Sequence, residues 1–300
     1  MKPQIRTDLA AEARELWREN AAETDTLPGV EASQSSEQGF GVTSVHVLDE
    51  TGENALCKPI GKYITIELDS MLRREEDSFA RAASVLSGHI RTLLELEGEE
   101  TVLIAGLGNP AITPDAIGPQ AVDYVLVTRH LKQRMPESFG GFRNVAAVRA
   151  GVLGTTGMES ADMVSALAAK LQPDRVIAMD ALASRHLERL CRTVQLSDTG
   201  IVPGSGVGNH RAALNRETLG VPVLAIGVPT VVEAATLAVE LAGRAGVSEL
   251  DSQRFGADGG MIVTPRDIDR NVHDAAKLIG YAVNLALHDG LTVEDVDLFL

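Results

Sequence analysis

Short apolar runs alternate with amphipathic segments over the last two thirds of the chain. The apolar runs have the length of strands, which we predict at 101–106, 145–149, 175–180, 193–197 and 222–227. Segments with helical periodicity separate them, and we predict helices at 119–134, 158–171 and 230–243. Because strands alternate with helices, the pattern favours an α/β fold with a largely parallel sheet flanked by helices.

The amino-terminal third of the chain has a different pattern. Residues 1–38 are polar and charged, whereas 41–48 and 61–68 alternate between apolar and polar positions as strands do. The turn-forming sequence DETGEN separates the two strands, so we predict a long β-hairpin that forms an extension at about residues 39–70. A helical pattern follows over 77–96.

Three threonines precede an acidic residue with the spacing of a helix capping box. The pairs are Thr230 with Glu233, Thr264 with Asp267, and Thr292 with Asp295. We therefore expect a helix to begin at each threonine, with Pro265 in the first helical position after Thr264. Residues 244–260 are the best candidate for a mobile loop.

Composition and charge exclude several classes of protein. The chain has 300 residues, of which 44% are hydrophobic, enough for a sizeable core. A net charge of −15 would repel a phosphate backbone, so we expect no direct nucleic-acid binding. No apolar stretch approaches the roughly 18 to 20 residues of a membrane span. Two cysteines, Cys57 and Cys191, are too few for a disulfide framework, which favours a reducing, cytoplasmic location.

A glycine-rich stretch, GLGNPAITPDAIGP at 106–119, follows the first apolar strand of the α/β part. Gly106, Gly108 and Ala111 match the G-x-G-x-x-A pattern of a dinucleotide-binding turn. However, prolines delay any regular helix until about residue 119, and no G-K-[ST] motif follows this loop or GSGVGN at 204–209. A non-enzymatic nucleotide-binding module that uses these loops is an alternative.

Two acids lie just past apolar strands, where open α/β sheets usually place their sites. Asp115 lies in the glycine-rich loop and Asp180 ends the strand RVIAMD. If two carboxyl groups share a site, one can keep a proton while the other deprotonates water. Alternatively, Asp115 belongs to a short helical turn that starts at Thr113, and Asp180 caps a helix over ALASRHLERL.

A metal site is a further alternative, because two carboxylates can hold a divalent ion if a histidine or a third carboxylate joins them. The candidate histidines are His186 and His210. Serine chemistry is less favoured, because the sequence has no G-x-S-x-G motif and Ser205 has no evident partner.

Long stretches of the chain closely resemble the germination protease (spore protease) family of endospore-forming bacteria. In chain order they are RTDLAAEA, KPIGKYITIEL, GLGNPAITPDAIGP, RVIAMDALASR, TGIVPGSGVGNHR, ETLGVPVLAIGVPTVVEAAT and MIVTPRDID. The resemblance implies an endopeptidase that degrades small acid-soluble spore proteins during germination, in the cytoplasm of the forespore and spore core. It also implies a zymogen that assembles into a homotetramer, trims its own amino terminus, and has a fold related to hydrogenase maturation endopeptidases.

The same resemblance assigns roles to individual residues. Asp115 and Asp180 match the two catalytic aspartates of the family. Self-cleavage is expected between Asp8 and Leu9, since an acidic residue, a hydrophobic residue and Ala10 stand in the order that the family cleaves. Residues 1–8 are then a possible pro-segment, and 9–300 a single α/β protease domain that includes the extension.

We expect substrate-binding residues in the two glycine-rich loops. They are Asn109, Asn209, His210 and Arg211, of which Arg211 is a candidate partner for an acidic substrate side chain. We predict no cofactor and assign no metal ligand.

Overall fold

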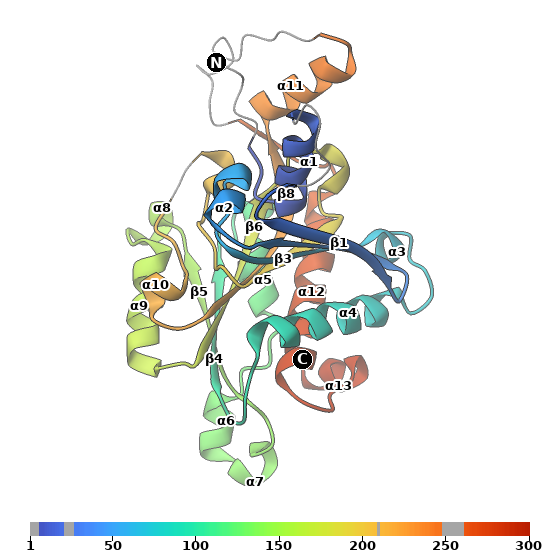
Figure 1. Cartoon of the computed structure of the whole chain (residues 1–300). Coiled ribbons are helices and arrows are strands. Elements are labelled where there is room, and N and C mark those ends of the chain that lie inside the picture. Colours follow the sequence, from blue (N-terminus) through green and yellow to red (C-terminus); the bar gives the residue numbers. More distant parts are fainter. Residues whose placement is uncertain (1–5, 21–26, 209–210, 248–260) are drawn as a thin grey trace.

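The computed structural model describes residues 6–20, 27–208, 211–247 and 261–300. Its centre is a mixed sheet in the order β1-β2-β3-β7-β8-β6-β4-β5, with β9 paired to β8 (Figure 1). The strands are β1 Val30–Glu37, β2 Phe40–Val47, β3 Gly61–Glu67, β4 Thr101–Leu107, β5 Asn144–Gly151, β6 Arg175–Ala183, β7 Thr193–Ser197, β8 Val223–Glu233 and β9 Ile262–Val263. Strands β8, β6, β4 and β5 pair in parallel, whereas β1, β2, β3 and β7 pair antiparallel and join the parallel half at β8.

Helices cover both faces of the parallel half, as the two-sided burial of its strands requires. On one face lie α4 Ser78–Leu94, α5 Ile117–Val122 and α12 Ile268–Leu287, and on the other α9 Ser160–Leu171 and α10 Arg216–Leu219 (Figure 1). Successive residues of β4 alternate between the two layers: Val102 and Ile104 belong to the core under α12, and Leu103 and Ala105 to the core under α9. The α/β class with flanking helices is therefore confirmed, and among the described residues parallel pairing is confined to four strands.

The remaining elements are shorter or lie at the edges. The helices are α1 Ala10–Asn20, α2 Glu50–Leu56, α3 Asp69–Leu72, α6 Arg129–Arg134, α7 Pro136–Phe139, α8 Leu153–Thr156, α11 Ala234–Arg244 and α13 Val293–Phe299. Single 3₁₀ turns are η1 Thr113–Asp115, η2 Leu187–Arg189 and η3 Ser205–Val207. No helix in the described part of the chain has the length and apolarity to cross a membrane.

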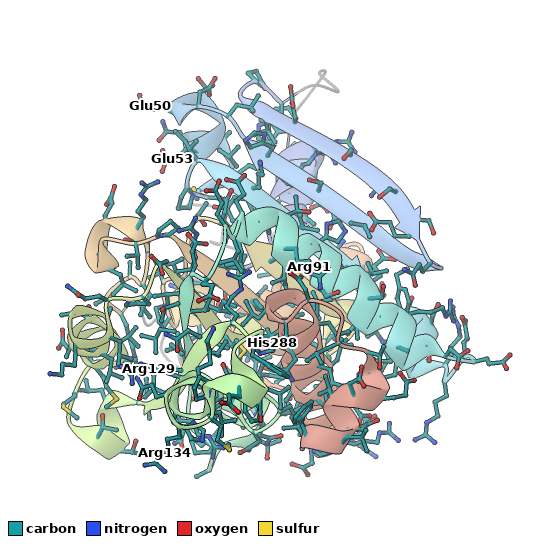
Figure 2. The ribbon with its side chains drawn as sticks, turned by 90° about the horizontal axis from the view of Figure 1, so that it is seen from below. Glu50, Glu53, Arg91, Arg129, Arg134 and His288 are labelled. Carbon is teal, nitrogen blue, oxygen red and sulfur yellow. The ribbon has the colours of Figure 1, made fainter. Side chains whose placement is uncertain are left out.

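Helices α4 and α12 lie side by side, and Figure 2 shows this pair from below. The guanidinium of Arg91 on α4 donates to the carbonyl oxygens of Leu285 and Ala286, so it caps the carboxyl end of α12. His288, just past that end, accepts from the backbone N–H of Arg143 at 3.2 Å, and burial lowers its pKa to about 4. His288 is therefore neutral near pH 7 and serves packing.

The predicted hairpin is wrong in two details. The extension has three strands, because β1 pairs with β2 along its whole length. Sequence periodicity missed β1 since most of its side chains are polar and exposed. The sequence DETGEN is not a hairpin turn, because Asp49 accepts from the backbone N–H groups of Thr51 and Gly52 and starts α2.

The helix predicted at 119–134 is also wrong, because it is divided into α5 and α6. The buried side chain of Asn284 on α12 accepts from Leu126 N–H and donates to Tyr124 C=O. It thereby satisfies backbone groups that a continuous helix would have paired internally.

Two of the three predicted helix starts are wrong. Thr230 lies in β8, where its hydroxyl donates to Pro114 C=O, and α11 begins only at Ala234. Thr264 donates to Thr230 C=O, and α12 begins at Ile268. The capping box of Thr292 and Asp295 is confirmed. Of the predicted mobile loop at 244–260, residues 248–260 lie outside the described residues.

Candidate active site

The glycine-rich stretch packs backbone against backbone and so fixes the position of Asp115. A Cβ atom on Gly106 would lie 2.4 Å from Gly118 C=O, and one on Gly118 would lie 2.2 Å from Met179 C=O. Gly108 has φ +109°, and a Cβ there would lie 2.0 Å from Asp115 C=O. Because these three glycines have no side chain, β4, β6 and the loop can pack closely against one another.

Asp115 ends the 3₁₀ turn η1, and its carboxylate accepts from the backbone N–H of Asn109 at 2.8 Å. The short turn of the alternative interpretation is thus present, but the carboxyl group faces a cavity and bonds back to its own loop. Thr230 Oγ1 donates to Pro114 C=O at 2.6 Å and ties this turn to β8.

Asp180 lies inside β6, because this strand continues to Ala183 instead of ending at the acid. Its side chain is 5% exposed and accepts from Ala181 N–H at 2.8 Å. The alternative role as a helix cap is wrong, since a strand residue follows it.

Asp115 and Asp180 line one cavity of about 270 Å³ at the carboxyl ends of β4 and β6. Burial, followed by the charge of Asp115, raises the pKa of Asp180 well above its usual range. Burial also raises the pKa of Asp115, while the N–H of Asn109 and the charge of Arg211 oppose the rise. The geometry therefore provides two interacting carboxyl groups, of which Asp180 is the more strongly protonated.

We expect Asp180→Asn to be more stable than the parent chain at neutral pH. Below the ordinary Asp pKa the carboxyl group is protonated in both folded and unfolded chains, so the two proteins should be about equally stable. As the pH rises, the unfolded chain ionises first, and the parent loses about 1.4 kcal/mol of stability for each unit by which folding raises the pKa. Urea unfolding at pH 4, 6 and 8 checks this, with exposed Asp162→Asn as the control. If the stability advantage of Asp180→Asn over the parent chain did not grow with pH, this prediction would be wrong.

The chain's own amino-terminal segment enters this cavity through Asp8. The Asp8 carboxylate accepts from Ser205 Oγ at 2.6 Å and from Ala183 N–H at 2.8 Å. Asp8 N–H donates to Ala183 C=O at 2.9 Å, so the segment runs along the end of β6. Residues far apart in the sequence thus hold Asp8 beside the two aspartates.

The peptide bond between Asp8 and Leu9 is held on both sides. The carbonyl oxygen of Asp8 accepts from Lys58 Nζ and Gln195 Nε2, each at 3.1 Å. On the other side, Ala10 N–H donates to Gln195 Oε1 at 2.8 Å. The Leu9 side chain is fully buried.

A fully buried carboxylate anchors the helix that follows. Glu12 of α1 accepts from Ser184 Oγ at 2.7 Å, from Arg185 N–H at 2.7 Å, and from Thr7 Oγ1. These bonds join the start of α1 to the segment just after β6, and so keep residues 7–10 in place.

The structure describes two of the four predicted substrate-binding residues, Arg211 and Asn109. Arg211 lines the cavity and pairs with Glu159 at 3.3 Å. Asn109 positions Asp115 through its backbone, while its side chain accepts from Ala111 N–H. Asn209 and His210 lie outside the described residues.

Of the two candidate metal ligands, the structure describes only His186. His186 is not among the residues that line the cavity, and its ring contacts Glu240 at 2.9 Å and Glu15 at 3.8 Å. Within the described ranges, no three His, Cys, Asp or Glu side chains form a group suited to a metal. The other candidate, His210, lies outside the described residues.

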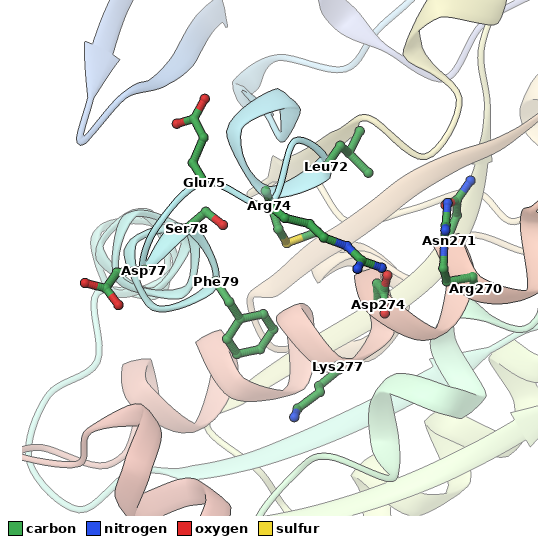
Figure 3. A pocket seen from close by; sticks show the side chains of 11 residues that line it. Leu72, Arg74, Glu75, Asp77, Ser78, Phe79, Arg270, Asn271, Asp274 and Lys277 are labelled. Atoms are coloured by element: carbon green, nitrogen blue, oxygen red, sulfur yellow. The ribbon is translucent and has the colours of Figure 1, made fainter.

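A larger cavity, of about 660 Å³, lies elsewhere, between the α3–α4 region and α12 (Figure 3). Its walls carry cations such as Arg74 and Lys277 together with acids such as Glu75 and Asp274. The cavity with the two raised-pKa carboxyl groups is the better candidate active site, because acid and base chemistry requires such groups.

Sequence reasoning found the two aspartates but missed four residues that hold the amino-terminal segment: Lys58, Ser184, Gln195 and Ser205. Gln195 lies in an alternating strand and resembles an ordinary polar strand position. Ser205 matches no catalytic motif in the sequence. The glycines that flank it were the one signal that its loop approaches another chain segment closely.

Comparison with known proteins agrees with the resemblance. The family model described as germination protease matches residues 10–242. The germination protease of Caldanaerobacter subterraneus subsp. tengcongensis is 43% identical over 99% of this chain and 98% of that protein. The Clostridium tetani germination protease is 40% identical over 99% of both chains. A structural comparison with the [NiFe] hydrogenase maturation protease HycI from Thermococcus kodakarensis gives a TM-score of 0.37 and 16% identity, over 65% of this chain and 98% of that one.

The family match covers most of the chain, and these relatives align over nearly its full length. The chain therefore belongs to the germination protease family of peptidases.

Proposed function

We propose that the chain is an endopeptidase in which Asp115 and Asp180 together activate water to hydrolyse a peptide bond. The observation that carries this proposal is the shared cavity, which holds two carboxyl groups of raised pKa and an acidic residue of the chain's own amino terminus. Membership of the germination protease family supports it.

The surroundings of the two acids suggest their roles. Asp180 keeps the proton, because it is the more deeply buried acid and faces the charge of Asp115. Asp115 is the base, because the N–H of Asn109 and the charge of Arg211 favour its ionised form. Water loses a proton to Asp115 and its oxygen adds to the carbonyl carbon. The C–N bond then breaks as the amide nitrogen takes the proton of Asp180, which leaves a carboxylic acid and an amine. Asp115 now carries a proton and Asp180 is ionised, and proton exchange with solvent restores the pair.

The proposed substrates are small acid-soluble spore proteins, which the family resemblance implies. The proposed location is the cytoplasm of the forespore and spore core, and the proposed assembly is a homotetramer.

Incubation of the purified chain with a small acid-soluble spore protein, followed by mass mapping of the fragments, tests the function directly. We expect internal cleavage after acidic residues that are followed by a hydrophobic residue and alanine. An intact spore protein after prolonged incubation with a chain shown by circular dichroism to be folded would refute the proposed activity.

Self-processing is the second part of the proposal, with residues 1–8 as a pro-segment and 9–300 as one protease domain. The bond between Asp8 and Leu9 is already held at Asp8 C=O and at Ala10 N–H. A tethered segment also reaches the acids at high effective concentration.

We expect mildly acidic incubation of the full chain to yield a product that begins at Leu9, because acid helps one carboxyl group keep its proton. Amino-terminal sequencing over a time course measures the product, and Asp115→Asn should not form it. If Met1 or Lys2 remains the first residue in a preparation that still digests spore protein, self-processing is refuted and the peptidase assignment stands.

A further inference from the structure

The carboxylate of Asp8 occupies a small pocket with three components. Ser205 Oγ donates to one carboxylate oxygen at 2.6 Å, and the Ala183 N–H donates to the other at 2.8 Å. The third component is Gly206, where a Cβ atom would lie 2.3 Å from the second oxygen. We call Ser205, the Ala183 amide and Gly206 the carboxylate pocket.

Asp8 itself is also held through its backbone. Asp8 N–H bonds to Ala183 C=O, and Asp8 C=O accepts from Lys58 and Gln195. Hydrogen bonds to backbone atoms do not depend on which side chain this position carries. The charge of Lys58 also acts on the Asp8 carboxylate, but the side chain's hydrogen bonds come from the carboxylate pocket.

The pocket is suited to a carboxylate side chain for a physical reason. Each oxygen faces its own donor, and hydrogen bonds to a charged acceptor are about twice as strong as neutral ones. An apolar side chain would leave the Ala183 N–H unpaired beside the cavity, which is the kind of mismatch that gives a polar site its selectivity. The structure thus contains a binding pocket for an acidic side chain, and Arg211 is not part of it.

We propose that the carboxylate pocket selects the acidic residue on the amino-terminal side of the cleaved bond, in protein substrates as well as in the chain's own Asp8. This inference rests on the proposed endopeptidase function. It assigns specificity to Ser205, Ala183 and Gly206, and it leaves the chemical step to the two aspartates.

A double-mutant cycle on self-cleavage of the full chain tests the pocket. Ser205→Ala should slow formation of the product that begins at Leu9 by about 10- to 100-fold, because it removes a hydrogen bond to a charged group. Asp8→Asn should slow it by a similar factor. The double variant should be hardly slower than either single variant, because both changes remove the same interaction. Ser87→Ala, which removes a buried hydroxyl on α4, is the control and should keep the parent rate.

A second arm measures the fragments of a small acid-soluble spore protein, digested by chain that has completed self-cleavage. Cleavage by Ser205→Ala should lose its preference for acidic residues. Multiplicative rate losses in the cycle, or a Ser205→Ala variant that cleaves itself as fast as the parent, would overturn the inference. A parent chain that digests spore protein at sites without acidic residues would also overturn it and leave the peptidase function in place. A folded parent chain that cleaves neither itself nor spore protein would refute the proposed function.

Discussion

Asp115→Asn and Asp180→Asn should each reduce cleavage of spore protein by about 10²- to 10⁴-fold while the chain stays folded. Each substitution keeps the volume of the side chain and removes its ability to take or give a proton. Since the two carboxyl groups act in one step, the double variant should be little worse than either single variant. Initial rates of fragment formation at several pH values measure the effect.

The control for this pair is Asp162→Asn, which changes an exposed acid on α9 and should keep the parent rate. Thermal unfolding and far-UV circular dichroism show whether each variant is folded. If one of the two cavity variants were as active as the parent, that aspartate would have no role in proton transfer, and a mechanism based on the pair would be wrong.

Gly118→Ala should have the largest effect on stability. Its Cβ atom would lie 2.2 Å from Met179 C=O, 2.3 Å from Leu107 C=O and 2.5 Å from Leu107 N. All three are backbone atoms of neighbouring strands, so relief requires β4, β6 and the loop of Asp115 to separate. We expect a loss of about 3 kcal/mol or more in the free energy of unfolding, together with loss of activity.

Gly88→Ala is the matched control, because Gly88 lies in α4 and a Cβ atom there would meet no atom within 4 Å. The same change should stabilise the chain by about 0.5–1 kcal/mol, since alanine favours helix. Urea unfolding should show a lower free energy of unfolding than the parent for Gly118→Ala and a higher one for Gly88→Ala. A Gly118→Ala chain as stable as the parent would mean that the loop does not pack on β6 as described.

The sequence was sufficient to predict the parallel half of the fold. Strands such as 101–106 and 175–180 are continuous apolar runs because helices cover both of their faces, and this burial leaves a strong signal. β1 left no such signal, since its side chains are mostly polar and exposed and its stability comes from pairing with β2. The break between α5 and α6 depends on Asn284, more than 150 residues away, so local periodicity could not show it.

Some residues of the candidate site could also be predicted from the sequence, and others could not. Asp115 and Asp180 could be found because acids next to apolar strands are conspicuous, and the resemblance named the same two residues. Ser205 and Gln195 could not be assigned, because their partners are atoms of Asp8 and Ala10 at the opposite end of the sequence. A side chain that recognises backbone or a distant carboxylate has no pattern of its own in one sequence.

The contacts of Asp8 can form only after distant parts of the chain have been synthesised. Asp8 leaves the ribosome well before its partners Ala183, Gln195 and Ser205. β8, which lies between β7 and β6, comes later still and ends at residue 233. Because domains fold only when their distant strands are available, the amino terminus must wait unbound until then. The cavity that holds Asp8 includes Thr230 and Val231 of β8. A nascent chain released before β8 is complete would therefore leave Asp8 exposed to other proteases.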